Sequence, residues 1–113
     1  MGLVKLASAA NAAVEADVPE GNEYTVILNV NGTAPSGSTA TISAKALGAN
    51  FFEELVENSD VDLTAPSTVR ISYPGGAHAE LSAIKVVPNA TFTADPTSTI
   101  DVLVNVVNVD GRS

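Results

Sequence analysis

Few residues of this sequence could do chemistry, and an acidic stretch near its middle is the first candidate. Asp60 and Asp62 follow Asn58, so carboxylate and carbonyl oxygens could be offered to calcium. An EF-hand loop starting at Asp60 needs glycine at its sixth position and glutamate at its twelfth, where this chain has Ala65 and Ile71. A looser calcium loop is the alternative to a solvated acidic turn, and we favour the turn. We therefore expect no metal site and no cofactor.

The single histidine, His78, is the next candidate for acid–base chemistry. Glu80 follows two residues later, and alternate residues of a strand share a face, so a His–Glu pair is conceivable. A nucleophile is still missing, because the chain has no cysteine and no Gly-x-Ser-x-Gly elbow. We expect His78 to lie exposed in a turn, and we expect no catalytic residues and no enzymatic activity.

The charge of the chain narrows the range of partners. Thirteen acidic residues against five basic ones give a net charge of −8, and the basic residues are scattered along the sequence. Such a field repels nucleic acid and anionic lipid surfaces. No apolar run approaches the roughly 18 residues of a membrane-spanning helix, and the N-terminal residues lack the apolar core of a signal peptide. We expect neither a nucleic-acid partner nor a membrane partner.

Alternating apolar and polar residues predict β-strands through most of the chain after residue 22. The expected strands are residues 24–31, 39–46, 68–73, 79–87, 91–94 and 99–109, with the first two joined as a long-looped hairpin. A change of phase between Ala83 and Ile84 indicates a β-bulge or a strand buried on both faces. Aliphatic residues on both faces of 99–109 make it a central strand, with Val104 and Val106 in the core.

One short helix is expected within residues 48–58. Its apolar face would consist of Phe51, Phe52, Leu55 and Val56. Asn50 is a suitable N-cap, and the glutamates that follow suit the positive end of a helix. We expect this helix to close one end of the β core.

The first 22 residues differ from the rest of the sequence. Residues 7–16 are rich in alanine, and Pro19 and Gly21 break the chain before the first clear strand. The segment is either a frayed, weakly helical terminus or an arm that orders against a partner. On the second interpretation, the partner-binding residues are Leu3, Val4, Lys5 and Leu6.

These elements together predict a mainly β fold. We expect an antiparallel β-sandwich or barrel, Ig-like or jelly-roll-like, with one short helix and an N-terminal arm. The expected division is an arm at residues 1–22 and a β-sandwich domain at residues 23–113.

In composition and strand pattern over residues 23–109, the chain resembles the small head-decoration (cement) proteins of tailed bacteriophages and the Ig-like accessory domains of phage virions. It lacks the cysteines and tryptophan of an antibody-type Ig domain. The resemblance implies a non-enzymatic structural protein of a virus particle that binds the outside of the assembled capsid and stabilises it. The implied partner is the major capsid protein or another virion protein, with self-association left open. The implied location is the virion, reached from the host cytoplasm during assembly.

A second function remains open on the sequence alone. A carbohydrate- or ligand-binding adhesin-type β-sandwich module would need an exposed aromatic residue near polar groups. Tyr73, beside the turn at 74–76, is the candidate for that role.

Overall fold

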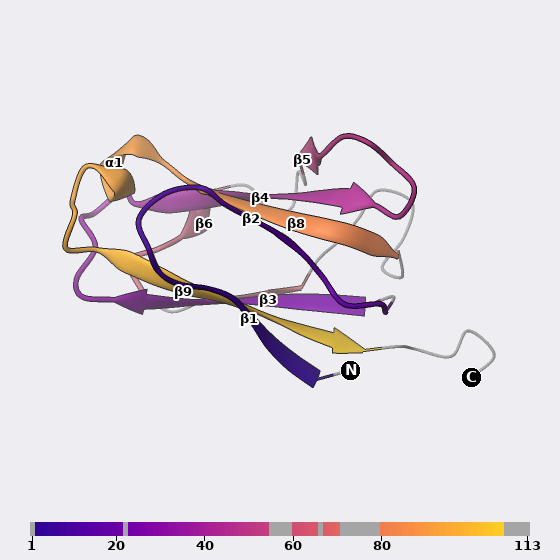
Figure 1. Ribbon diagram of the computed structural model, residues 1–113. Coiled ribbons are helices and arrows are strands. Elements are labelled where there is room, and N and C mark those ends of the chain that lie inside the picture. Colours follow the sequence, from indigo (N-terminus) through magenta and orange to yellow (C-terminus); the bar gives the residue numbers. More distant parts are fainter. Residues whose placement is uncertain (1, 22, 55–59, 66, 71–79, 108–113) are drawn as a thin grey trace.

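The computed structural model describes residues 2–21, 23–54, 60–65, 67–70 and 80–107, which form a mainly β structure of two antiparallel sheets and one short helix (Figure 1). Sheet A contains, in spatial order, β1 (Gly2–Ala10), β9 (Thr99–Val107), β3 (Glu23–Asn31) and β7 (Ser67–Arg70). Sheet B contains, in spatial order, β2 (Val14–Asp17), β8 (Leu81–Pro88), β4 (Thr39–Ala46) and β5 (Glu53–Glu54), and β6 (Val61–Asp62) also pairs with β4. Both sheets end in edge strands within the described residues, so the barrel alternative is wrong.

The core lies between the two sheets, which Figure 1 shows one above the other. Alternate residues of β3 and β9 point into it, as the period of two requires. The fully buried side chains of these two strands are Tyr24, Val26, Leu28, Ile100, Val102, Val104 and Val106. Burial of Val104 and Val106 confirms the predicted phase of the last strand, and the position of β9 between β1 and β3 confirms that it is central.

The N-terminal segment does not lie apart from the sheets. Strand β1 pairs antiparallel with β9, and β2 pairs antiparallel with β8, so the first 17 residues contribute an edge strand to each sheet. Leu6, Ala7 and Ala10 pack against the core. These pairings correct the predicted division into an arm at residues 1–22 and a domain at 23–113. Backbone pairing stabilises this segment, and backbone pairing leaves little trace in side-chain periodicity.

Two polar side chains fix the N-terminal strands to the rest of the molecule. The carboxylate of Asp101 on β9 accepts a hydrogen bond from the Ala9 backbone N–H at 2.8 Å, where Ala9 has a φ of +50°. The amide of Asn11 donates to the backbone carbonyl oxygens of Ser98, Asp95 and Phe92 at 2.6, 3.0 and 3.2 Å. The crossing from β1 to β2 is therefore held by groups more than eighty residues away in sequence.

The predicted hairpin of the first two strands is also wrong. Strand β3 pairs with β9 and β7, whereas β4 pairs with β8, β5 and β6, so the loop at residues 32–38 crosses from sheet A to sheet B. Ala34 and Ser38 in this loop are buried. Burial of these two side chains draws the loop across the end of the core, from one sheet to the other.

The helix forms at a different place from the one expected. Residues 91–94, predicted as an edge strand, instead belong to the short helix α1 (Ala90–Thr93) and its C-cap, while Glu53 and Glu54 form strand β5. The Asn89 side chain caps α1 by accepting a hydrogen bond from the Phe92 N–H at 3.1 Å, and the Phe92 ring is fully buried. Burial of that one ring fixes a single helical turn, which is too short to show a helical period. Residues 55–59 of the predicted helix lie outside the described residues.

The remaining strand predictions hold within the described residues. Strands β3, β4 and β9 follow the predicted ranges, and β7 covers the first part of 68–73, whose last residues lie outside the described ones. Strand β8 has a register shift against β4, which falls between Leu81 and Ala83. The irregularity was expected between Ala83 and Ile84, and both of these side chains are buried.

Candidate interaction surface

The outer face of sheet A carries aliphatic side chains where water-facing residues would be expected. Ile27 on β3 lies directly opposite Leu103 on β9. Their sequence neighbours point into the core and are fully buried, so these two side chains point outward. Both are partly exposed, and neither packs against the core between the sheets.

Two further aliphatic residues extend this surface. Leu3 on β1 lies opposite Asn105 and is therefore diagonal to Leu103, within reach of a long side chain. Val107 lies on the same outer face of β9, two residues after Asn105. Leu3 is 58% exposed and Val107 39% exposed. We name the set Leu3, Ile27, Leu103 and Val107 the sheet A patch.

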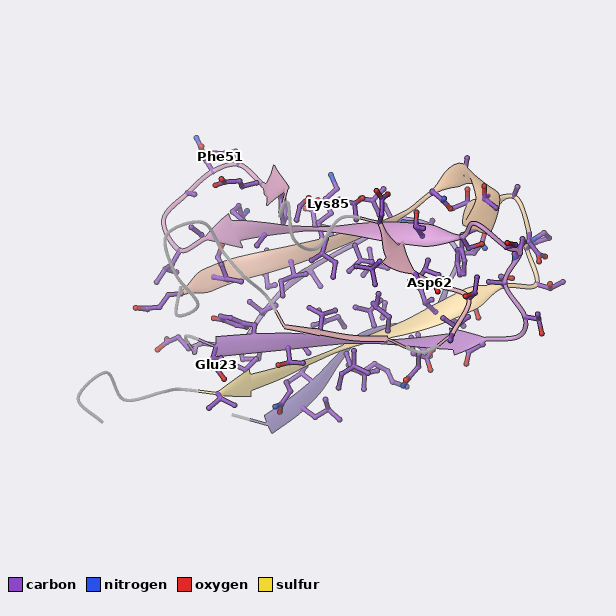
Figure 2. The ribbon with its side chains drawn as sticks, turned by 180° about the vertical axis from the view of Figure 1, so that it is seen from behind. Glu23, Phe51, Asp62 and Lys85 are labelled. Atoms are coloured by element: carbon purple, nitrogen blue, oxygen red, sulfur yellow. The ribbon has the colours of Figure 1, made fainter. Side chains whose placement is uncertain are left out.

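The outer face of sheet B is built differently. The ammonium groups of Lys45 and Lys85 lie 5.4 and 5.6 Å from the centre of the Phe52 ring, so this ring covers part of that face. The outward residues Ser43 and Ala83 next to them are buried. Figure 2 shows Lys85 and Phe51 on this side of the molecule, away from sheet A. Sheet B thus has a local cover, which the sheet A patch lacks among the described residues.

The four predicted partner-binding residues all lie on β1, at the edge of sheet A. Leu3 and Lys5 point outward beside the sheet A patch, because they lie opposite Asn105 and Leu103. Val4 points inward but is 38% exposed. Leu6 is partly buried and packs against the core. The structure therefore brings Leu3 and Lys5 together on one surface and separates Leu6 from them.

The charges around the sheet A patch are mixed. Asp101 shares the outer face of β9, and the hydrogen bonds that its carboxylate accepts from the Ala9 N–H and the Asn31 amide hold its pKa below the usual value. Nearby Lys5 adds a smaller lowering of that pKa. Glu23 lies opposite Val107 at the other end of the patch. An apolar surface with a polar, charged border is the usual anatomy of a protein–protein interface.

The candidate chemical groups do not assemble into a site in the described part of the chain. Asp60 and Asp62 are exposed, and Asp62 accepts hydrogen bonds from the Thr64 N–H and hydroxyl at 2.9 and 2.8 Å, which lower its pKa. Among the described residues, no group of three or more histidine, cysteine or acidic side chains is placed to hold a metal. Asn58, Tyr73 and His78 lie outside the described residues.

The aliphatic character of the sheet A patch was only partly visible in the sequence. Leu103 stood out as apolar on the second face of its strand, whereas Ile27 fell among residues taken as a polar face. Their pairing across β3 and β9 is set by the register, which periodicity within one strand does not specify. The signal that could have found the patch is an aliphatic residue at an outward position on two neighbouring strands.

Within the described residues, none of the helical structure has the length and apolar character needed to cross a membrane. Comparison of the chain with protein-family models, with curated protein sequences and with solved structures gives no match.

Proposed function

We propose that this chain is a non-enzymatic structural protein of a virus particle, which binds the outside of the assembled capsid as a decoration or stabilising protein. On this proposal the fold is a β-sandwich of the Ig-like or jelly-roll-like kind. Its partner is the major capsid protein or another virion protein, and it is located in the virion after assembly in the host cytoplasm. Neither nucleic acid nor a membrane takes part.

The observation that carries the proposal is the sheet A patch. Ile27 and Leu103 lie side by side on an outer sheet face, with Leu3 beside them and Val107 further along β9. Isolated exposed aliphatic residues are normal on soluble proteins, but a contiguous set with a polar border marks a binding surface. Binding another protein would cover the patch. The resemblance to head-decoration proteins supplies the identity of the partner, and the net charge of −8 fits a basic or neutral partner surface.

The test is binding of the purified chain to capsids assembled without it. We expect saturable binding at micromolar concentration, and we expect Leu103→Asn to weaken it at least tenfold because the patch loses its central side chain. The matched control is Val87→Asn, since Val87 is an outward aliphatic residue, 37% exposed, on an inner strand of sheet B. The control should bind within twofold of the parent.

Circular dichroism and thermal melting must show both variants folded before binding is compared. Equal binding by the two variants would remove the sheet A patch from the proposal. Absence of saturable binding by the parent chain at micromolar concentration would contradict the capsid role itself.

A further inference from the structure

The free edge of β1 is distinct from the patch on the face of the sheet. The other edge strands in the described part of the chain, β2, β5, β6 and β7, have two to four residues, whereas β1 has nine. Short strands and bulges protect a sheet edge from pairing with another chain. The register shifts of β1 begin after Lys5, so Gly2–Lys5 is a regular strand that pairs with β9 on one side only. This stretch can accept a further strand.

Val4 indicates that the edge is incompletely covered. It lies directly opposite Val104, so the two side chains share the inner face of sheet A. Val104 is fully buried, whereas Val4 is 38% exposed. Val4 stays accessible because β1 is the last strand of sheet A in the described part of the chain. A strand added beside β1 would cover it.

We propose that the added strand is β1 of a second copy of this chain, paired antiparallel about a two-fold axis at Val4. Opposite residues in a sheet share a face, so this register sets Val4 against Val4 on the inner side and Lys5 against Leu3 on the outer side. A register centred on Lys5 would place two lysines opposite each other, which is unfavourable. The register at Val4 covers the exposed valine of both copies at once.

The charge distribution favours a second copy at this edge over contacts elsewhere. Each chain carries a net charge of −8, so two copies repel over most of their surfaces. Residues 2–10 contain no acidic side chain and include Lys5, so the copies meet where repulsion is weakest. Added salt should tighten the pair because it screens the remaining repulsion. The pairing does not depend on the proposed capsid role, although it would place two sheet A patches on one continuous sheet and so raise avidity.

Sedimentation equilibrium of the intact chain over micromolar to millimolar concentration tests the pairing. We expect a monomer–dimer equilibrium that Leu3→Lys weakens at least tenfold, because it sets lysine against Lys5, and that Leu3→Glu maintains or tightens. Repulsion between the net charges alone predicts the opposite order of dimer affinities. Leu3→Lys changes the net charge of each chain from −8 to −7 and so weakens the repulsion, whereas Leu3→Glu changes it to −9 and strengthens the repulsion. The same two changes at Phe51, which is 59% exposed and lies by sheet B, control for that effect.

A cross-link gives a second measurement, since the chain has no cysteine of its own. Val4→Cys should oxidise rapidly to a covalent dimer, because directly opposite residues in a sheet lie within reach of a disulfide. Phe51→Cys is the control and should oxidise slowly. A chain that stays monomeric throughout, or Leu3→Lys dimers as tight as those of Leu3→Glu, would overturn the pairing. Both Leu3 variants should lose capsid binding if the proposed function holds, so the two proposals fail separately.

Discussion

The hydroxyl of Tyr24 donates a hydrogen bond to the carbonyl oxygen of Gly21 at 2.8 Å, and this contact closes the turn that carries the chain from β2 in sheet B to β3 in sheet A. The same hydroxyl accepts a hydrogen bond from the Leu81 N–H at 3.3 Å. A tyrosine hydroxyl that bonds to backbone a few residues upstream resembles the tyrosine corner described for β-sandwich proteins, and we use the word corner for this contact. A Cβ at Gly21 would overlap the Val106 side chain, so glycine lets the turn approach β9 this closely.

Tyr24→Phe should destabilise the protein by about 1–3 kcal/mol, because the buried Leu81 N–H loses its partner while the ring remains. Urea unfolding monitored by circular dichroism measures the change in the free energy of unfolding. A loss below about 0.5 kcal/mol, the range of neutral surface changes, would show that the corner does not stabilise the fold.

The stability that Tyr24 contributes should fall at alkaline pH. Burial raises the pKa of its hydroxyl above the ordinary value of 10.0, so the folded protein keeps the proton after the unfolded chain has lost it. The contribution is therefore complete below about pH 10 and is lost as pH rises through the folded pKa. The difference in unfolding free energy between the parent and Tyr24→Phe should shrink from pH 9 upward. A constant difference to pH 11 would contradict the burial of this hydroxyl.

Asn11→Ala should destabilise the protein by about 1–3 kcal/mol, since the Asn11 amide donates hydrogen bonds to the carbonyl groups of Ser98, Asp95 and Phe92. Asn29→Ala, at an exposed outward position of β3, is the matched control and should change stability by less than about 0.5 kcal/mol. Thermal melting of the two variants gives the comparison. Equal effects would mean that the crossing between β1 and β2 is held by other contacts.

Asp101 should make the attachment of β1 sensitive to acid. The hydrogen bond from the Ala9 N–H, followed by that from Asn31, holds the carboxyl pKa below its ordinary value of 3.8. The stabilisation is present above pH 3.8 and is lost as pH falls through the lowered folded pKa. The stability difference between the parent and Asp101→Asn should therefore narrow on acidification. A stability difference that stays constant on acidification would contradict this role of the Asp101 carboxylate.

Val104→Asn and Leu103→Asn should differ sharply although they are neighbours. Val104 is fully buried, so an unpartnered amide there costs several kcal/mol, a large part of the roughly 5–15 kcal/mol that stabilises a domain. Leu103 points outward from sheet A, and its variant should remain folded. Soluble yield and melting temperature report the difference. Similar melting temperatures would mean that the phase of β9 is wrong by one residue.

The face of each side chain was predictable where apolar and polar residues alternate strictly, as around Val104. The pairing of strands was not predictable where backbone hydrogen bonds determine it. Register shifts within β1 break any alternation, and its contacts with β9 depend on residues about a hundred positions away. Phe51 and Phe52 fit a helical spacing, but one is exposed and the other lies beside two ammonium groups, so tertiary contacts outweigh the local pattern. The interaction surface depends on register, which no single-strand pattern contains.

The position of β9 between β1 and β3 has a consequence for synthesis of the protein. Both neighbours precede it in the chain by some seventy residues or more, so neither can complete its pairing until residues 99–107 have left the ribosome. Sheet B has no such dependence, since residues up to Pro88 supply all its described strands. Sheet B can therefore form first and serve as the surface on which sheet A is assembled last. Until then β1 has no neighbour in sheet A and β3 has only β7, and the high negative charge of the chain helps to keep that intermediate soluble.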